Sequence, residues 1–484
     1  MDEYSQWDSP LSFIFAMIGA AVGLGNIWRF SYVLYSNGGG AFFIPYLFAI
    51  AIMGIPFLIL EYGIGFSFKD SFTNIFKRIN PKFEIISWIL VLLVFGVVTY
   101  YVVIIAWDLI YLMSSFTFSW GSDSALYFVN SVGGSSNISN LTTIIIPTFI
   151  AVLLMWLVVW FISHKDINSG IGRFTKIFIP VLFVVMAFII VYAIFLPGSD
   201  IGIVTLLNPD WNSLLNVNIW LAAFSQILFS LSMGQAIAVS YASYLPENSK
   251  LTDNVFIVVI SNSLFEIFTA FGVFSILGYM SQTAGTPMVQ LISEGTGLVF
   301  IVFPTIFNIM GSMARIIAPV FFIAILFAGL TSVIGVFEPM VNSTFNKLGW
   351  SRKKAVTVLS IIGCSFSLVF TTGCGSYILG IVDSFINNFA LIILIAIECI
   401  VFAWFYDIDS LIPMLNQKSR FQVGKLWKFI LKYLLPIFLI IMWIMGVFDL
   451  IMDMDTMKIT IYIIITVLIL VSSVVLTKFP LKNN

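Results

Sequence analysis

Apolar stretches long enough to cross a membrane run through the chain almost from end to end. A spanning helix needs about 20 mostly apolar residues, because the hydrocarbon core of a bilayer is about 30 Å thick. Of the 484 residues, 60% are hydrophobic and only 9% are charged, which excludes a water-soluble surface. The sequence therefore predicts an all-α integral membrane protein. Its twelve expected transmembrane helices lie near residues 11–36, 41–67, 84–116, 141–163, 170–196, 218–243, 252–281, 314–346, 352–372, 376–405, 426–450 and 458–477.

The positive charges are distributed unevenly between the two predicted sides of the membrane. Of the 22 Lys and Arg residues, 19 fall on one side, and the exceptions are Arg29, Arg315 and Lys458. Cytoplasmic loops carry such an excess, so we expect a multi-pass protein of the cell (plasma) membrane with both termini in the cytoplasm. The basic clusters then set the topology, and they give no reason to expect a nucleic-acid partner.

Two of the predicted spans contain sequences that favour a break in the helix. The first span holds three glycines in Gly19–Gly25, and each glycine weakens a helix by about 1 kcal/mol. The sixth span holds Ser230–Gln235, in which a central glycine follows two hydroxyl residues. Small residues in a membrane helix are also compatible with close packing and no break. The positions of the two segments, in the first and sixth spans, favour breaks in two related five-helix repeats.

These repeats would together form one transporter domain, residues 1–484. We expect the first repeat over 11–196, an inverted second repeat over 218–405, and two peripheral helices over 426–477. Unwound backbone in a membrane frees carbonyl and amide groups that need partners. Freed carbonyls can bind Na⁺, and freed amides at a helix N-terminus can bind a carboxylate, so the breaks predict a transport site near the midplane of the bilayer.

Several ionisable residues fall inside predicted spans, where a charge costs about 2.5–3.5 kcal/mol. The five that need a reason most are Arg29, Glu61, Glu266, Glu338 and Asp383. Arg29 and Asp383 would meet above the first break, either as an external latch or as a fixed structural bridge. Asp108 and Glu398 lie nearer to span ends, where we expect contact with water.

Distinctive motifs cover nearly the whole chain. They are WDSPLSFIFAMIGAAVGLGNIWRF at 7–30, NGGGAFFIPY at 37–46, GIPFLILEYGIG at 54–65, TYYVV at 99–103, FSLSMGQAIAVSYASY at 229–244, FAGLTSVIGVFEPM at 327–340 and VDSFINNF at 382–389. These motifs strongly resemble the neurotransmitter:sodium symporter family, and in particular its prokaryotic members similar to the bacterial leucine transporter. The family fold is a twelve-helix inverted repeat with broken first and sixth helices. The resemblance implies secondary active, sodium-coupled symport by alternating access.

The same resemblance implies two bound sodium ions. Besides the substrate carboxylate, the first ion would use oxygens of Ala21, Asn26, Ser230 and Asn262. The second would use carbonyls of Gly19, Val22 and Ala328 and hydroxyls of Thr331 and Ser332. Neither shell contains a carboxylate side chain, which suits a monovalent ion better than Ca²⁺. From the residues alone, Thr331 and Ser332 fit equally well with hydrogen bonds to the carbonyl four residues earlier.

A substrate pocket between the two breaks is also implied by the resemblance. Its wall would consist of Ala21, Leu24, Gly25, Val97, Tyr101, Phe229, Ser230, Ser232, Gln235, Ser332 and Val336. The amides of Leu24 and Gly25 and the Tyr101 hydroxyl would hold a carboxylate. Backbone carbonyls of the broken spans, with Ser232, would hold an ammonium group. Phe229 and Tyr101 would close over the substrate as an external lid.

Three positions narrow the expected substrate and ion dependence. Gly23 stands where the family's monoamine carriers have Asp, so we expect a substrate that brings its own carboxylate, an α-amino acid. Gln235 replaces a bulky apolar residue of the bacterial leucine transporter, and it either bonds a polar side chain or fills space beside water. Glu266 stands where chloride-dependent relatives have Ser, so its carboxylate would replace chloride. We expect chloride-independent transport, with Glu266 as a candidate proton carrier on the return step.

The expected inner gate matches the family only in part. Trp7 and Tyr244 occupy matching positions. The Arg–Asp pair that closes the cytoplasmic side of the bacterial leucine transporter maps to Tyr4 and Asn346, which cannot form a salt bridge. We therefore expect weaker closure on this side, or closure by Glu3 and other partners.

Other functional classes fit the sequence less well. A channel or receptor-like membrane protein would not need two occluded ion sites. A membrane enzyme would need a motif such as HExxH, GxSxG or a phosphate-binding loop, and the sequence contains none of them. Within the transporter class, the alternatives to an amino acid are another small amine and a betaine-like solute. The sequence leaves open which amino acid is carried and whether the protein is a monomer or a dimer.

Overall fold

Helices build the part of the protein that the structure describes. The computed structural model describes residues 6–135, 140–292, 295–452 and 456–479. Within these residues, extended backbone pairs only at one isolated β-bridge, between Ile144 and Thr372. The fold is therefore all-helical, as the sequence predicts.

Ten helical stretches of the described residues are long and apolar enough to cross a membrane. Seven of these stretches contain one α-helix each: α6 (Glu84–Ser114) in Pro81–Ser114, α8 (Ile146–Ser163), α9 (Arg173–Ile194) in Asn168–Ile194, α13 (Leu251–Ala284), α16 (Ala314–Leu348) in Gly311–Leu348, α17 (Arg352–Ser367) in Arg352–Thr371, and α23 (Thr456–Lys478). The other three contain two α-helices joined by a short π-helical turn: α3 (Phe43–Ala49) and α4 (Ile55–Phe68) in Gly39–Phe68, α18 (Gly375–Ser384) and α19 (Leu391–Ile400) in Gly375–Phe405, and α21 (Lys425–Phe429) and α22 (Leu435–Met452) in Lys425–Met452.

Shorter helices lie in the connections between these stretches. They are α5 (Phe72–Ile79), α7 (Ser124–Ser131), α10 (Ser199–Leu207), α14 (Met288–Leu291), η7 (Leu298–Val302), α15 (Phe303–Ile309) and α20 (Leu411–Asn416).

The first predicted span is bent sharply at its glycine-rich segment. Helix α1 (Pro10–Ala21) and helix α2 (Leu24–Ser36) meet at 53°, and together they make an eleventh candidate span. Val22 and Gly23, which join them, have extended backbone conformations. The break expected from the sequence is therefore present.

The sixth predicted span, 218–243, is also interrupted. Helix α11 (Val217–Ser230) ends at the expected break, and helix α12 (Ile237–Ser243) begins only at Ile237. Between them, Ser232, Gly234 and Ala236 have φ angles of 49°, 64° and 58°, which a right-handed helix does not allow. Each piece is shorter than a full span, so the total of twelve spans and the division into repeats stay predictions.

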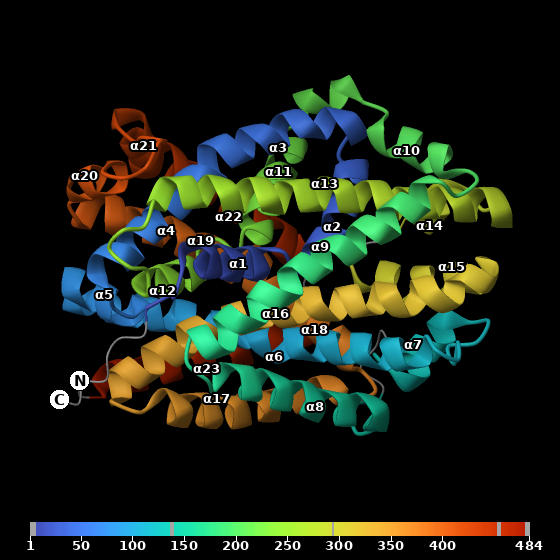
Figure 1. Cartoon of the computed structure of the whole chain (residues 1–484). Coiled ribbons are helices and arrows are strands. Elements are labelled where there is room, and N and C mark those ends of the chain that lie inside the picture. Colours follow the sequence, from blue (N-terminus) through green and yellow to red (C-terminus); the bar gives the residue numbers. More distant parts are fainter. Residues whose placement is uncertain (1–5, 136–139, 293–294, 453–455, 480–484) are drawn as a thin grey trace.

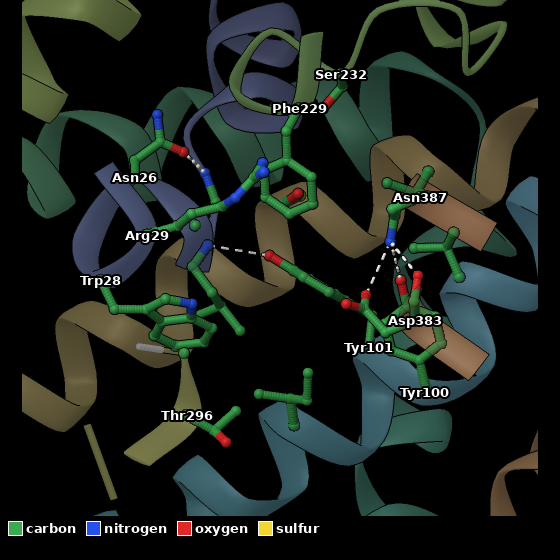
Figure 2. A pocket seen from close by; sticks show the side chains of 18 of the residues that line it. Asn26, Trp28, Arg29, Tyr100, Tyr101, Phe229, Ser232, Thr296, Asp383 and Asn387 are labelled. Carbon is green, nitrogen blue, oxygen red and sulfur yellow. Dashed lines mark hydrogen bonds between the residues drawn. The ribbon is translucent and has the colours of Figure 1, made fainter. Parts of the chain in front are cut away.

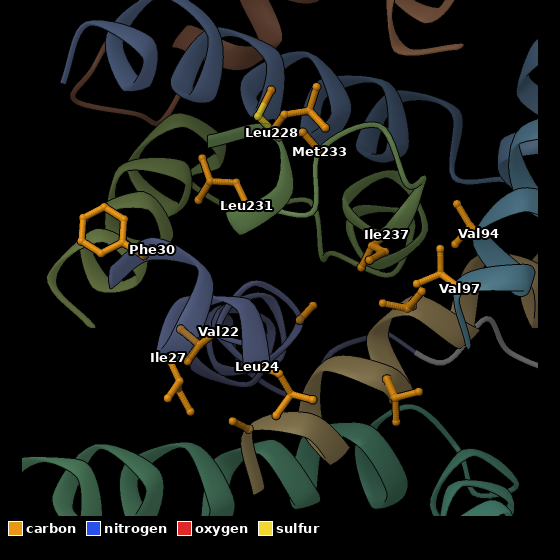
Figure 3. Packing of buried hydrophobic residues seen from close by; sticks show 14 of the residues in the cluster. Val22, Leu24, Ile27, Phe30, Val94, Val97, Leu228, Leu231, Met233 and Ile237 are labelled. Carbon is orange, nitrogen blue, oxygen red and sulfur yellow. The ribbon is translucent and has the colours of Figure 1, made fainter. Parts of the chain in front are cut away.

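The broken spans lie inside a bundle of longer helices. Figure 1 shows α6, α13 and α16 running along the length of the bundle, with α8 and α17 packed side by side at its edge. Helix α1 packs against α12 and α16, and α2 packs against α11 and α13. The two breaks therefore lie close together, and the apolar side chains around them form part of the core (Figure 3).

Candidate functional site

A cavity of about 550 Å³ lies between the two broken spans, a size typical of small-molecule sites. Its wall, part of which Figure 2 shows, includes Arg29, Thr296 and Asp383, on the side predicted to face outward. Of the eleven residues expected to line the substrate pocket, all but Ser230 lie on its wall. They are Ala21, Leu24, Gly25, Val97, Tyr101, Phe229, Ser232, Gln235, Ser332 and Val336.

Two glycines at the first break let neighbouring groups approach the backbone closely. A Cβ atom at Gly23 would lie 2.8 Å from the Tyr101 hydroxyl oxygen, and one at Gly25 would lie 2.4 Å from Cε1 of Phe229. The Tyr101 hydroxyl accepts a hydrogen bond of 3.1 Å from the backbone N–H of Leu24. The N-terminus of α2 and the Tyr101 hydroxyl therefore face the same part of the cavity, where they could hold a carboxylate together.

The Ala20 carbonyl accepts hydrogen bonds from two hydroxyls on other elements. Ser232 donates at 3.1 Å from the sixth-span break, and Ser332 donates at 3.2 Å from α16. Sequence reasoning missed Ala20, although the last carbonyls of a helix always need partners from outside it. The hydroxyls expected to hold an ammonium group and a sodium ion thus meet at one carbonyl.

Three of the side chains expected around the first sodium ion are connected by hydrogen bonds. Asn26 donates from Nδ2 to Oδ1 of Asn262 at 2.8 Å, and Asn262 donates to Oγ of Ser230 at 2.5 Å. The Asn26 Oδ1 atom accepts from the backbone N–H of Gly23 at 2.9 Å. The Ser230 side chain therefore points toward α13, and the expected role of the Ser230 carbonyl at the substrate stays a prediction.

Glu266 lies at the centre of a fully buried set of donors. Its Oε2 atom accepts from the Tyr46 hydroxyl at 2.6 Å, and its Oε1 atom accepts from Gln226 at 2.9 Å and from Asn26 at 3.2 Å. Tyr46 and Gln226 were not anticipated, because nothing in their local sequence relates them to α13. Asn26 donates hydrogen bonds to both Glu266 and Asn262. The Glu266 carboxylate therefore contacts a residue of the expected sodium shell without belonging to that shell.

The residues expected around the second sodium ion also lie together. A Cβ atom at Gly19 would lie 3.1 Å from Cβ of Thr331, so the end of α1 packs directly on α16. The Thr331 hydroxyl donates to the carbonyls of Phe327 at 2.9 Å and Ala328 at 3.1 Å. The bond to the carbonyl four residues earlier, which the sequence left open, is present. Val22, whose carbonyl is another expected ligand of the second sodium ion, lies in the unwound segment between α1 and α2.

The two residues of the expected external latch lie in the wall of the same cavity (Figure 2). Arg29 donates to Oγ of Ser225 at 3.0 Å, and its guanidinium lies 4.6 Å from the centre of the Phe229 ring. Asp383 accepts a hydrogen bond of 2.8 Å from Asn387. Arg29 thus contacts one of the two expected lid residues, and its pairing with Asp383 stays a prediction.

On the predicted inner side, the N-terminal segment packs against the end of α12. The Trp7 indole donates to the Tyr241 carbonyl at 2.8 Å, and the Trp7 backbone N–H donates to the Tyr244 carbonyl at 3.0 Å. Asp8 pairs with Lys176 of α9 at 2.9 Å. Hydrogen bonds from Ser12 and then from Lys176 lower the pKa of the Asp8 carboxyl group.

A buried ion pair lies next to this contact. The Tyr244 hydroxyl donates to Oε1 of Glu338 at 3.1 Å, and Glu338 pairs with Arg352. Asn346 bonds within its own helix, to the carbonyl of Asn342, whereas Glu3 and Tyr4 lie outside the described residues. Which residues close the predicted inner side stays a prediction.

Three carboxylates inside the bundle are almost completely buried. Glu61 and Asp108 are 0% exposed and Glu398 is 1% exposed. The oxygens of Asp108 and Glu398 have no hydrogen-bond partner among the described residues, whereas the Glu61 carboxyl group faces the backbone N–H of Gly234 in the sixth-span break. The expectation that Asp108 and Glu398 touch water is therefore wrong. The position of a residue along a span does not predict its exposure to water, because both side chains face neighbouring helices.

Comparisons with known proteins agree with this arrangement. The model of the sodium:neurotransmitter symporter family matches residues 4–144 and 121–480. An uncharacterized sodium-dependent transporter of Methanocaldococcus jannaschii is 39% identical over 438 residues, which cover 90% of this chain and 89% of the relative. The sodium-dependent serotonin transporter of Drosophila melanogaster is 28% identical over 480 residues, which cover 91% of this chain and 76% of the relative.

Proposed function

Because the chain belongs to the sodium:neurotransmitter symporter family and is thus a sodium-coupled membrane symporter, we propose that it carries an α-amino acid into the cell. Transport would proceed by alternating access with two sodium ions and without chloride. A zwitterion moved with two Na⁺ carries two net charges, worth about 4.6 kcal/mol per 100 mV of membrane potential. The observation that carries the proposal is the arrangement around Gly23.

The backbone at Gly23 lies so close to Tyr101 that an added side chain would force its neighbours to shift. The Cβ atom of any other residue would be 2.8 Å from the Tyr101 oxygen and 3.1 Å from Oγ of Ser332. The protein thus has no carboxylate of its own at this point. The Leu24 amide and the Tyr101 hydroxyl are nevertheless positioned for one, so the substrate must supply it.

The opposite end of the substrate would be an ammonium group. The hydrogen bonds of Ser232 and Ser332 to the Ala20 carbonyl mark a group of oxygens beside the cavity. Oxygen acceptors of this kind satisfy the three donors of an ammonium group, and they also suit Na⁺. Only the unwound residues 22–23 separate the end of α1 from the start of α2, so the groups proposed for the two charges of the substrate belong to one short segment.

Gln235 supports a substrate with a polar side chain. This residue lies on the cavity wall, and its Oε1 atom is buried without a hydrogen-bond partner. A buried unsatisfied amide oxygen costs about 1–3 kcal/mol, which a donor on the substrate would recover. We therefore favour amino acids with a hydroxyl or amide side chain over purely aliphatic ones.

Glu266 supports independence from chloride. Its carboxylate is buried beside Asn26 and Asn262, and it accepts hydrogen bonds from three donors. A fixed negative charge at this position would balance the positive charge of the adjacent sodium ion, which is the role that chloride has in relatives with Ser.

Competition between matched pairs of compounds tests the substrate class. Each pair consists of an amino acid and the amine left when its carboxylate is removed, presented to purified transporter in proteoliposomes with an inward Na⁺ gradient. Amino acids should compete for uptake, serine and glutamine more strongly than leucine, and their amines should be much weaker. Equal competition by the amines would contradict an amino-acid substrate.

A further inference from the structure

Asp108 is a buried carboxyl group that the proposed transport mechanism does not use. It lies in α6, its side chain is 0% exposed, and neither of its oxygens has a hydrogen-bond partner. Two further polar groups within one helical turn are also buried without partners, the indole N–H of Trp107 and the hydroxyl of Tyr111. Unsatisfied polar groups are rare in proteins, so three of them in one turn require an explanation.

The surroundings of this turn are aromatic. The Tyr111 ring lies 5.5 Å from the ring of Phe322 on α16, and 5.2 Å from the ring of Phe300 in η7. The Trp107 ring lies 5.3 Å from that of Phe128 in α7. An ionised carboxylate is strongly disfavoured in such a place, whereas a neutral carboxylic acid is tolerated.

No hydrogen bond from the described residues offsets this cost, because both oxygens of Asp108 are buried without a partner. Titratable groups around this turn are Tyr111 itself and Tyr127 of α7, whose ring lies 5.6 Å from that of Tyr111 and whose hydroxyl bonds Ser114. The charged groups on the cavity wall are Arg29 and Asp383. Burial without a hydrogen-bond donor favours the protonated form of Asp108 in this arrangement.

The same turn borders the central cavity. Ile104 and Trp107 lie on the cavity wall. Asp108 follows Tyr101 by seven residues, so it lies on the same face of α6 about 10 Å further toward the predicted outer side. Water that reaches Asp108 when the neighbouring cavity wall opens would stabilise its ionised form.

We propose that Asp108 is a proton-binding site that exchanges with the outer solution and couples opening of the cavity to external pH. Protonation stabilises the arrangement in which Asp108 is dry, and ionisation stabilises one in which the outer cavity is open and hydrated. By linkage, a rise in external pH shifts the population toward the open form, by at most tenfold per pH unit for one proton. The inference rests on the membrane orientation and alternating access of the proposed function.

This site differs from Glu266 in its chemistry and in its access. Glu266 accepts three hydrogen bonds, from Tyr46, Gln226 and Asn26, which stabilise a charged carboxylate without water. Asp108 has no such donors. Because Asp108 lies beyond Tyr101 on the outer side, its proton returns to the outer solution, and the site adds pH sensitivity without net proton transport.

The test measures opening of the cavity and needs no amino acid. Thr296, which lies on the cavity wall, is changed to Cys in a full-length background with Cys364, Cys374 and Cys399 replaced by Ala. A membrane-impermeant cationic thiol reagent is added outside proteoliposomes in choline buffer, between about pH 5.5 and 8.5. The labelling rate is divided by that of the same protein carrying Asp108→Asn, which cancels the ionisation of the thiol itself.

The ratio should rise at least about threefold as the external pH rises, because only the wild-type side chain can ionise. Changing the internal pH alone should leave it constant. Asp108→Glu should retain the rise, and Asp108→Leu should label like Asp108→Asn, which keeps the test usable if one variant folds poorly. A ratio that is constant with external pH, or one that follows internal pH, overturns the proposal whether or not the transported solute is an amino acid.

Discussion

Arg352 at the start of α17 forms a two-pronged ion pair with Glu338 of α16. The Nη1–Oε1 and Nη2–Oε2 distances are 2.6 Å and 2.7 Å, and the Glu338 side chain is 1% exposed. The Nε atom of Arg352 also donates to the carbonyls of Ser163 and Lys165, and Tyr244 donates to Glu338. One guanidinium thus connects α8, α16, α17 and the end of α12. This cluster lies beside Trp7 and Tyr244, the residues expected to close the predicted inner side.

Changing Glu338 to Gln should destabilise the protein and loosen the inner side. Removal of one partner from a buried ion pair costs about 3–5 kcal/mol, because the other charge stays buried. We expect a clearly lower melting temperature in detergent, measured by tryptophan fluorescence. The control is Lys176→Ala, which removes the half-exposed pair with Asp8 and should change stability little. Equal effects of the two variants would contradict a special role for the Glu338 pair.

Changing Gly23 to Ala should impair substrate binding more than folding. The added Cβ atom would lie 2.8 Å from the Tyr101 oxygen, so the hydroxyl must leave its hydrogen bond with Leu24. We expect the KM for the amino acid to rise more than tenfold in uptake assays. The control is Gly424→Ala, because a Cβ atom at Gly424 meets no atom within 4 Å. An unchanged KM in Gly23→Ala would remove the main support for the carboxylate site.

Changing Glu266 to Ser should create a requirement for chloride. The variant loses the fixed negative charge beside Asn26, and chloride can restore it. Uptake should fall to near zero in gluconate buffer and recover in chloride buffer, whereas the wild type should be equally active in both. Glu266→Gln, which keeps the size of the side chain but offers no room for an anion, should be inactive in both. A Ser variant that works equally well without chloride would contradict the assigned role of Glu266.

Changing Thr331 to Val distinguishes the two interpretations of its hydroxyl. As a sodium ligand, the hydroxyl is essential, and its loss should raise the Na⁺ concentration for half-maximal uptake more than tenfold. As a donor to the Phe327 and Ala328 carbonyls only, it is dispensable. Thr175 is a matched control, because its buried hydroxyl donates to the carbonyls of Ile171 at 2.9 Å and Gly172 at 3.3 Å. If Thr331→Val and Thr175→Val leave the sodium dependence equally unaffected, Thr331 is not a ligand.

The breaks in the first and sixth spans could be predicted from the sequence because their causes are local. Glycine and hydroxyl residues weaken a helix wherever they occur, and both helices end within a residue or two of the expected segments. The residues that line the cavity were expected from the family resemblance, because most of them belong to these segments or to motifs beside them. Ser230 is the exception, because its direction depends on Asn262 of a distant helix.

The missed contacts all depend on packing between distant segments. Tyr46 and Gln226 meet Glu266 only because α3, α11 and α13 converge. From the hydropathy pattern, Asp108 is expected to be a polar residue in contact with water near the end of a span. In the structure, aromatic rings of three other elements pack around its helical turn. The backbone of Ala20 is invisible to sequence motifs, because its role belongs to a carbonyl and not to a side chain. Local pattern therefore predicts where a helix breaks but not which groups meet there.

The most direct test of the account is uptake of radiolabelled amino acids by the purified transporter in proteoliposomes. A panel of all twenty is presented with an inward Na⁺ gradient, with an equal K⁺ gradient, and with Na⁺ plus a sodium ionophore. At least one amino acid should accumulate above its external concentration with the Na⁺ gradient alone, and it should do so without chloride. Accumulation of none of them, or accumulation that persists without Na⁺, would contradict sodium-coupled amino-acid transport.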